Sequence, residues 1–424
     1  QLSANLKTPD EIFIKNYDYS KVNAVLARNT MDNLNTIKKI KFDNMLLIGS
    51  TGYLGAHVLD AFLQSNKGIA YCLVREKDGL DIKERLRGVL NFYFGNKYNE
   101  LFNNRIKVVC GDIVKENLGL SENDYSELKN NIDIVINSGA LVKHFGIKKK
   151  FEEINVKGTQ SVIDFCLNTK KRLLHVSTIS VSGNGEKEET VIETPENIND
   201  KKIFKESDIY VGQNIKGVYS TTKFRAELLV LEAISSKGLD AQILRLGNIT
   251  NRYSDGVFQM NADENAFAKR IKSFIEIGAF PKYMLKHSIE LTPVDLAAKA
   301  IIRAANYTSV CNVLHIYNTH LLEIKLLINT LNNDLHIDVL PVNDTMMKDI
   351  ITGVLADNNR KDILSGIIYD LDENKQLIYT SNIRLNCSFS EEYFNKIDFY
   401  WKNIDKDYII KYINYLRKIK FIKD

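Results

Sequence analysis

The stretch from Met45 to Gly55 constrains the fold of this chain more than any other. Met45 to Ile48 is a short apolar run typical of a buried strand, and the residues after Gly55 place apolar side chains on one face of a predicted helix. A tight glycine turn between a strand and a helix lets a pyrophosphate approach the backbone and the helix N-terminus. The spacing G-x-x-G-x-x-G therefore favours a dinucleotide site over a turn without a ligand. Its candidate contacts are Gly49, Ser50, Thr51, Gly52, Tyr53, Leu54 and Gly55.

Apolar runs alternate with helical segments along most of the chain. The strand-like runs lie at 45–48, 69–74, 106–110, 132–136, 172–177, 241–246 and 312–317. This alternation predicts an α/β fold with a doubly wound, Rossmann-type parallel sheet and helices on both faces. After about residue 320 the alternation loosens, which predicts a smaller mixed α/β lobe. Its expected elements are helices near 321–332 and 343–355, a strand-like pair around 364–384 and a final amphipathic helix containing Tyr408, Tyr412 and Leu416.

The expected domain boundaries follow from this pattern. Residues 1–40 lack the alternation and contain a capping box, Thr8 to Glu11, so they are predicted to be lead-in or linker helices. Residues 41–252 form the predicted Rossmann domain, to which residues 291–320 return. Residues 253–290 and 321–424 form the predicted substrate-binding lobe.

Composition excludes several classes of function. The 424 residues are 44% hydrophobic with a net charge of +4, and no tract is densely basic or long enough to span a membrane, so neither nucleic acid nor a membrane is expected as a partner. The five cysteines are scattered, and no His/Cys cluster has metal-ligand spacing. We expect reduced thiols, no metal and a cytoplasmic location. The abundance of lysine, asparagine and isoleucine is typical of an AT-rich bacterial genome.

The end of the second predicted strand bears on the choice of cofactor. An acidic residue there would bind the ribose 2′-hydroxyl, whereas this chain has Val74-Arg75-Glu76. Arg75 could pair with a 2′-phosphate, helped by Arg85, and this favours NADPH. Two alternatives stay open: Glu76 could take the ribose role, and Arg75 could be a solvated surface residue.

Small or polar residues follow two further predicted strands. The third strand ends in Gly111-Asp112-Ile113, where a carboxylate could accept a hydrogen bond from the adenine amine. The fourth ends in Asn137-Ser138-Gly139-Ala140, where small side chains let a cofactor pass close to the backbone. The added candidate contacts are Asp112, Ile113, Ser138, Gly139 and Ala140.

Tyr219 and Lys223 are the candidate proton donor and its partner. Four Tyr-x-x-x-Lys pairs occur in the chain, so the spacing alone is weak, but this pair follows the fifth strand, where a nicotinamide would lie. That strand ends in Ser177-Thr178, which places hydroxyls at the same edge of the sheet. Thr178 and Tyr219 could both bind one carbonyl oxygen, and Lys223 would favour the phenolate of Tyr219. The alternative is that Thr178 and Tyr219 only cap and pack local structure.

Together these residues resemble the extended short-chain dehydrogenase/reductases. Further motifs are similar to the terminal thioester reductase domains of nonribosomal peptide synthetases, and to domains of carboxylic acid reductases and α-aminoadipate reductases. The likeness runs from about residue 20 to the C-terminus. The motifs that carry it are His175-Val-Ser-Thr178-Ile-Ser-Val, Arg245-Leu-Gly247-Asn248-Ile-Thr, Tyr253 to Asn261, and Glu290-Leu-Thr-Pro-Val-Asp295.

The resemblance implies NADPH-dependent reductive release of a carrier-bound acyl or peptidyl thioester as an aldehyde, or further as an alcohol. It implies catalysis by Thr178, Tyr219 and Lys223, and adds Ser177, Tyr219, Lys223, Gly247 and Asn248 to the cofactor contacts. The expected partner is an upstream carrier protein with a phosphopantetheine-bound substrate. The start at Gln1 and the lack of an adenylation domain or a Gly-x-Asp-Ser site suggest a monomeric domain cut from a larger synthetase.

Several alternatives stay open. Lys269, Arg270 and Lys272 on a predicted helix could meet an acidic carrier protein, or could form an ordinary solvated face. A fatty acyl-CoA reductase or a nucleotide-sugar epimerase or dehydratase would share the glycines, Tyr219 and Lys223. An NADPH-binding scaffold without catalysis is the non-enzymatic alternative, although a pure binder has no need of a proton donor.

Overall fold

A seven-stranded parallel sheet forms the centre of the larger part of the molecule. The computed structural model describes residues 8–77, 79–142, 147–183, 202–357, 360–372, 377 and 383–423. The sheet has the strand order β12-β7-β5-β4-β1-β2-β3. Its strands are β1 (Met45–Ile48), β2 (Ala70–Val74), β3 (Ile106–Cys110), β4 (Ile134–Asn137), β5 (Arg172–Thr178), β7 (Ala241–Leu246) and β12 (Val313–Ile316). The predicted doubly wound fold is confirmed, and the seven predicted runs differ from these strands only at their ends.

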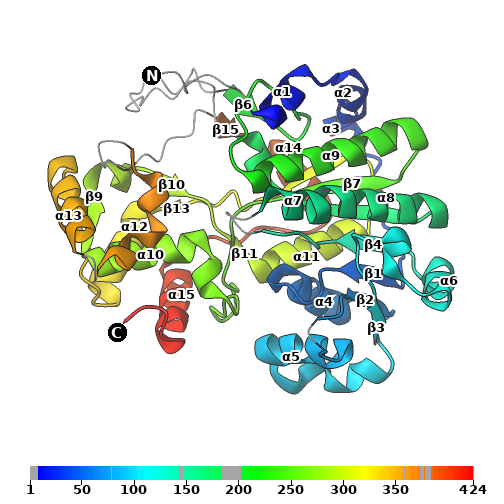
Figure 1. Ribbon diagram of the computed structural model, residues 1–424, viewed down its shortest axis with the longest axis horizontal. Helices are drawn as coiled ribbons and strands as arrows, with labels where there is room; N and C mark the ends of the chain where they lie inside the picture. Colours follow the sequence, from blue (N-terminus) through cyan, green and yellow to red (C-terminus); the bar gives the residue numbers. More distant parts are fainter. Residues whose placement is uncertain are drawn as a thin grey trace.

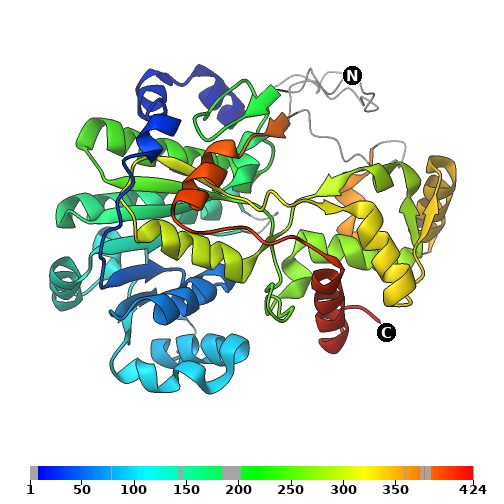
Figure 2. The ribbon, with the colours of Figure 1, turned by 180° about the vertical axis from the view of Figure 1, so that it is seen from behind.

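Helices cover both faces of the sheet, as Figures 1 and 2 show. One face carries α4 (Tyr53–Ser65), α5 (Ile82–Phe94) and α11 (Val294–Ala305). The other carries α6 (Glu122–Asn131), α8 (Gly158–Thr169) and α9 (Val218–Lys237). Because both faces are covered, every strand of the sheet except the edge strand β3 is buried along its whole length, which explains why most of these sequences read as apolar runs without alternation.

The strand order reverses beside β1. This strand pairs in parallel with β2 on one side and with β4 on the other, so that Ile48 lies opposite both Leu73 and Asn137. The connections after β1 and β4 therefore leave the sheet on opposite faces and open a crevice at the carboxyl ends of the two strands. Ligands of such sheets bind in this crevice. The predicted glycine turn begins there, directly after Ile48.

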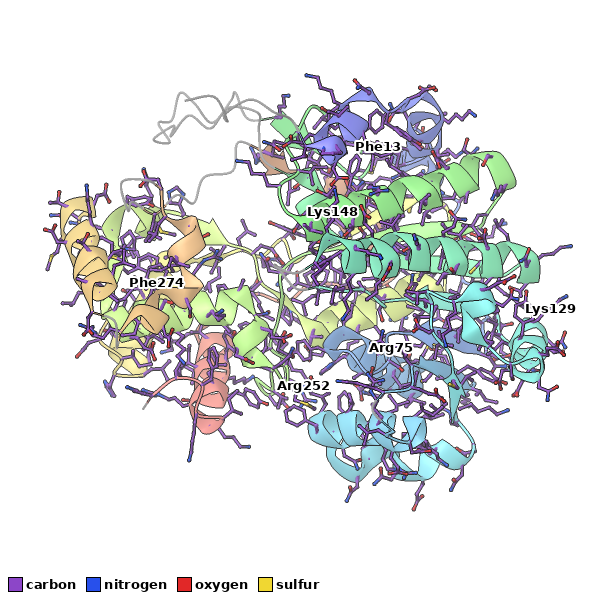
Figure 3. The ribbon with its side chains drawn as sticks, viewed as in Figure 1. Phe13, Arg75, Lys129, Lys148, Arg252 and Phe274 are labelled. Carbon is purple, nitrogen blue, oxygen red and sulfur yellow. The ribbon has the colours of Figure 1, made fainter. Side chains whose placement is uncertain are left out.

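A second lobe lies beside the carboxyl ends of the strands (Figure 1). Its main elements are α10 (Ala266–Ile277), β9 (Ala279–Pro281), α12 (Ile324–Asn329), β14 (Leu340–Val342), α13 (Asp344–Ala356) and α15 (Lys406–Lys418). They enclose a separate apolar core that includes Phe274, labelled in Figure 3, and the buried face of α15. The predicted helices near 321–332 and 343–355 and the predicted terminal helix are present.

The strand-like pair predicted around 364–384 is wrong in its first half. Lys361–Gly366 and Ile368–Asp370 are 3₁₀ turns. Gly366 packs so tightly on α10 that a Cβ there would lie 2.2 Å from the Lys269 carbonyl, and its amide donates to Ser273. Packing on α10 thus overrides the local strand preference. In the second half, Ile383–Leu385 forms β15, while residues 373–376 and 378–382 lie outside the described part of the chain.

Residues 383–401 belong to the Rossmann side and not to the second lobe, which corrects the predicted boundary. The strand β15 pairs with β6 (Lys202–Phe204), and α14 (Ser388–Lys396) packs beside β12. The His315 amide of β12 donates to the Ser390 hydroxyl of α14. The physical reason is the cluster of aromatic residues in this segment, which covers the edge of the large sheet: Phe389, Tyr393, Phe394, Phe399 and Trp401.

The N-terminal segment predicted to hold lead-in or linker helices is helical, and its helices pack on the Rossmann core. They are α1 (Pro9–Asn16), α2 (Ser20–Leu26) and α3 (Met31–Leu34), and the predicted capping box is present at the start of α1. Val22 and Leu26 of α2 are fully buried in the core shared with α9. No helix among the described residues is long and apolar enough to cross a membrane.

Two short sheets join the lobes. One pairs β8 (Ile249–Thr250) with β11 (Thr292–Pro293), and the other pairs β10 (Ser288–Ile289) with β13 (Leu322–Glu323). Both connect segments that flank the boundary between the lobes. The first sheet holds the residues after β7 against residues 292–293, and the second holds residues 288–289 against residues 322–323.

Candidate active site

The glycine turn brings β1 into close contact with the loop after β4. Gly49 has φ +88°, and a Cβ there would lie 2.8 Å from the Gly139 nitrogen. A Cβ on Gly55 would lie 2.0 Å from the Gly49 carbonyl oxygen. Gly52 is the N-cap residue of α4, so the N-terminus of α4 opens into the crevice. Only glycine fits at these contacts, and the resulting exposed backbone is suited to a pyrophosphate.

The side chains of the glycine turn differ in burial and in their contacts. Ser50 is buried at the end of β1, whereas Thr51 and Leu54 are half-buried. The Tyr53 hydroxyl donates to the Thr250 carbonyl at 3.0 Å, on the connection between the lobes. Tyr53 therefore ties α4 to the second lobe through its side chain and has its backbone at the glycine turn.

Arg75 and Arg85 lie together after β2. Arg75 is exposed, and the Arg85 guanidinium donates to its carbonyl oxygen at 2.6 Å. Arg75 is labelled in Figure 3. Glu76 is exposed and lies near the Cys110 thiol of β3, whose pKa is raised by burial and by the charge of Glu76. The two arginines share one surface.

The residues after β3 and β4 line the same edge of the sheet. The Asp112 carboxylate accepts from the Val114 amide, and Ile113 packs against Gly158 of α8. Ser138 donates its hydroxyl proton to the Ile48 carbonyl at 2.7 Å, and the Gly139 amide donates to the side chain of Asn137 at 3.1 Å. These bonds fix the loop that contains Ala140 against the glycine turn. The structure brings together the residues after β1 and β4 that the sequence placed there.

Thr178 and Tyr219 meet at the carboxyl end of β5. Thr178 is the last residue of β5, and Tyr219 is in the first turn of α9. Burial raises the pKa of Tyr219 to about 12, and the neighbouring Thr178 hydroxyl acts in the opposite direction. The phenol is therefore protonated at neutral pH and has a second hydroxyl beside it. Ser177 precedes this pair and is itself buried.

Lys223 lies one turn further along α9 and is turned into the protein. Its ammonium donates to the Val176 carbonyl at 2.7 Å and lies 3.2 Å from His175 Nε2. Burial lowers the pKa of Lys223 to about 8, with Glu227 acting in the opposite direction. The lysine is thus held under the carboxyl end of β5, close to the strand that ends in Thr178.

The sequence reasoning missed three buried polar residues near this set. His175 lies in a strand that is otherwise buried and apolar, and Glu227 follows Lys223 by four residues on α9. Arg245 on β7 pairs with Glu227 at 2.8 Å, and neither side chain is exposed. For His175 and Arg245 the available signal was a charged or imidazole side chain within a predicted buried strand, because such groups require a partner. Glu227 lies on the helix α9 and carried no such signal.

Gly247 and Asn248 are fixed by a buried carboxylate, Glu290. The Asn248 amide donates to Glu290 Oε2 at 2.6 Å, and the Asn248 side chain donates to the Glu290 carbonyl at 3.2 Å. A Cβ on Gly247 would lie 2.5 Å from the Glu290 carboxylate. Burial raises the pKa of Glu290 to about 7, although Thr292 and Asn248 donate hydrogen bonds to it. The sequence marks Glu290 only as the first residue of a motif and does not indicate this role.

The other Tyr-x-x-x-Lys pairs serve local structure. Tyr17 donates to Glu232, Tyr93 accepts from the Met260 amide, and Tyr125 packs against Phe165. All five cysteines are free. Among the described residues, no group of three or more His, Cys, Asp or Glu side chains is arranged to hold a metal ion.

Comparisons with known proteins agree with this geometry. The model of an NAD-binding family described as "Male sterility protein" matches residues 47–301. A stretch of 298 residues, 69% of this chain, is 29% identical to a linear gramicidin synthase polypeptide of Brevibacillus parabrevis, of which it covers 5%. Another, of 270 residues and 62% of the chain, is 30% identical to the L-2-aminoadipate reductase large subunit of Penicillium chrysogenum and covers 18% of it. The chain thus spans less than a fifth of either relative.

A solved structure covers almost the whole chain. It is the thiolation-reductase di-domain from an archaeal non-ribosomal peptide synthetase, with a TM-score of 0.84 and 30% sequence identity. The match covers 98% of this chain and 84% of that one. The likeness therefore extends from the Rossmann domain through the second lobe.

Proposed function

Because the chain belongs to the NAD-binding family described as male sterility proteins, and to the reductase domains of nonribosomal peptide synthetases, we propose that it releases a carrier-bound acyl or peptidyl thioester by reducing it to an aldehyde. The chain is an NAD(P)H-dependent oxidoreductase. The observation that supports the specific proposal is that the Thr178 and Tyr219 side chains lie beside each other at the carboxyl end of β5, on the same edge of the sheet as the glycine turn. They provide two hydroxyls for one carbonyl oxygen.

The proposed chemistry assigns one task to each residue. A bound nicotinamide cofactor supplies the hydride that adds to the thioester carbon. Thr178 and Tyr219 donate hydrogen bonds to the oxygen as it gains negative charge, and Tyr219 gives its phenolic proton to this oxygen. The C–S bond of the resulting hemithioacetal then breaks, which yields an aldehyde and the free thiol of the carrier. Lys223 would hold the cofactor ribose and favour the phenolate that remains on Tyr219.

The cofactor is proposed to be NADPH. Arg75 and Arg85 are the residues that would hold a 2′-phosphate, since their positive charges share the surface after β2. Backbone groups of the turn from Gly49 to Gly55 would hold the pyrophosphate. Comparing the dissociation constants of NADPH and NADH for the wild type and for Arg75→Gln tests this choice: the variant should lose affinity for NADPH alone.

The proposed partner is an upstream carrier protein within a multidomain synthetase. The helix α10 offers less free charge for this contact than its sequence suggests. Arg270 pairs with Asp370 at 2.7 Å, and the Lys272 ammonium lies 3.9 Å from Glu276 and over the ring of Phe421. An ordinary structural face is therefore the better interpretation of Arg270 and Lys272.

The decisive experiment presents the protein with NADPH and three substrates: a carrier-bound thioester, the same acyl group on coenzyme A, and the corresponding free aldehyde. NADPH loss is followed by absorbance, and products are identified by mass spectrometry. Release of a free thiol together with an aldehyde from the carrier-bound substrate is the expected result. Turnover of the coenzyme A thioester alone would favour a fatty acyl-CoA reductase. Binding of NADPH without turnover of any substrate would favour a scaffold.

A further inference from the structure

A histidine lies directly beneath the catalytic lysine, inside the sheet. His175 is 1% exposed and Lys223 is 2% exposed. The His175 Nε2 atom lies 3.2 Å from Lys223 Nζ, and the Val176 carbonyl next to it accepts from the same ammonium at 2.7 Å. Two neighbouring residues of β5 thus contact the amino group of Lys223 and fix its position.

The second ring nitrogen of His175 faces a different strand. His175 Nδ1 lies 3.4 Å from the side-chain amide of Asn137 at the end of β4. The oxygen of that amide accepts from the Gly139 amide, and Gly139 is the residue against which Gly49 packs. A continuous set of contacts therefore links Lys223 to the glycine turn through His175, Asn137 and Gly139.

Charge around this set keeps the imidazole neutral. Burial and the charge of Lys223 hold the pKa of His175 well below its usual range. The groups that act on Lys223 in the described structure are His175 from β5 and Glu227 from α9. Glu227 is in turn paired with Arg245 on β7. A positive charge on His175 next to the ammonium would be unpaired and buried, which is strongly unfavourable.

A neutral imidazole has one donor nitrogen and one acceptor nitrogen. When Lys223 is an ammonium, it can only donate, so Nε2 must be the acceptor and Nδ1 must carry the proton. The Asn137 side-chain amide must then turn its oxygen toward Nδ1 and give up the hydrogen bond from the Gly139 amide. When Lys223 is a neutral amine, Nε2 can carry the proton and donate to it, and Nδ1 accepts from the Asn137 nitrogen. The tautomer of His175 is therefore coupled to the protonation state of Lys223.

We propose that His175 is a positioning residue for Lys223: its neutral ring accepts a hydrogen bond from the ammonium, and its tautomer switches when Lys223 loses its proton. This inference rests on the proposed role of Lys223 in the reductase reaction, but its contacts do not depend on the substrate. Removal of the acceptor would leave the buried ammonium with fewer partners. Lys223 would then lose its proton at lower pH, and the phenolate of Tyr219 would lose its support.

The first test uses the wild-type protein with nitrogen-15-labelled histidine. The chain has seven histidines, and the His175 resonances are identified by their loss in His175→Gln. We expect His175 to stay neutral from about pH 6 to pH 9 and to change tautomer, and not charge, near the pKa of Lys223. Titration of His175 to an imidazolium near its usual pKa, or a tautomer that does not change across this range, would overturn the proposal.

The second test compares His175→Leu with His175→Gln. Leucine removes the acceptor, whereas the glutamine side chain can place an oxygen close to the position of Nε2. We expect the basic limb of the pH–rate profile to move down by about one pH unit in the leucine variant, because one charge-assisted hydrogen bond has about that effect on a pKa. The glutamine variant should keep the wild-type limb. The same limb in all three proteins would contradict a positioning role.

The two tests separate this inference from the proposed reaction. If the wild type reduces no thioester, the proposed function fails, but the histidine spectra still decide whether His175 follows Lys223. If the wild type is active and the leucine variant does not fold, the decision rests on the spectra of the wild type and of Lys223→Met. The tautomer change should be absent in Lys223→Met, and its persistence there would refute the coupling.

Discussion

The Arg245 guanidinium of β7 and the Glu227 carboxylate of α9 form an ion pair in which neither side chain is exposed. Arg245 Nε lies 3.1 Å from both carboxylate oxygens, and Nη2 lies 2.8 Å from one of them. The remaining donors of Arg245 reach the Lys205 and Asp208 carbonyls. The pair fixes α9, and hence Tyr219 and Lys223, against the strand that leads into Gly247 and Asn248.

Removing only one of the two charges of this ion pair should lower the stability of the protein strongly. Glu227→Gln leaves Arg245 buried without its counter-charge, and we expect the free energy of unfolding in urea to fall by about 3 kcal/mol. The double variant Glu227→Gln with Arg245→Met should regain part of this loss. Asp334→Asn is the control, because its partner Lys406 is 51% exposed, and its effect should be under about 1 kcal/mol. Equal effects at the two sites would contradict the assignment.

Tyr219→Phe should abolish thioester reduction while the protein still binds NADPH. The phenol is the proposed proton donor, and burial raises its pKa to about 12, so it carries its proton at neutral pH. We expect kcat to fall by about 10²- to 10⁴-fold, the range for loss of one acid catalyst. Tyr125→Phe is the matched control, since Tyr125 also precedes a lysine by four residues but packs against Phe165.

The dissociation constant of NADPH, measured by fluorescence, should change by less than about twofold in both variants, because neither substitution removes a group that holds the pyrophosphate. A Tyr219→Phe protein with the wild-type rate would show that another group donates the proton.

The sheet could be predicted because all of its strands except the edge strand β3 are buried on both faces. Apolar runs such as Met45–Ile48 carry this information locally, and the glycine spacing adds the position of the crevice. The return of α14 to the sheet could not be predicted, because an amphipathic helix specifies that it has a partner but not which one. The 3₁₀ turns around Gly366 depend on a contact with α10 that is distant in sequence.

The candidate site shows the same division. Gly49, Thr178, Tyr219 and Lys223 stand out by spacing and by their place after strands, and the structure brings them to one edge of the sheet. The residues that support them do not stand out. His175 is recognisable only as a polar side chain in an apolar run, and its contacts with Lys223 and Asn137 join three separate elements.

Glu290 should make the stability of the protein depend on pH. Burial raises the pKa of its carboxyl from 4.5 to about 7, so the folded protein takes up a proton more readily than the unfolded chain. Protonation of Glu290 therefore stabilises the folded protein at low pH. This stabilisation is lost as the pH rises from about 4.5 through about 7. The loss amounts to roughly 3 kcal/mol, to order of magnitude.

Glu290→Gln keeps the shape of the side chain and removes its charge. Urea unfolding of both proteins at about pH 5 and pH 8 should show that the variant gains stability relative to the wild type as the pH rises. The amide of the variant can still accept from the Asn248 backbone. A difference between the two proteins that is the same at both pH values would show that Glu290 does not titrate in this range.

Gly49→Ala should weaken cofactor binding, because both the backbone conformation and the close packing at this position require glycine. The backbone has φ +88°, which an alanine adopts only with strain, and the added Cβ would lie 2.8 Å from both the Gly139 nitrogen and the Ser138 carbonyl carbon. Gly139 and Ser138 would have to move away from β1, which would distort the turn that should hold the pyrophosphate. We expect at least about a tenfold loss of NADPH affinity and a loss of about 1–3 kcal/mol in the free energy of unfolding.

Gly88→Ala is the matched control for this substitution. Gly88 lies inside α5, and a Cβ there would meet nothing within 4 Å. Because alanine favours the helix over the unfolded chain, the variant should be more stable than the wild type by about 0.5–1 kcal/mol and should bind NADPH with unchanged affinity. Titration calorimetry with NADPH and urea unfolding separate the two effects. Undiminished NADPH affinity in Gly49→Ala would contradict a pyrophosphate site at the turn from Gly49 to Gly55.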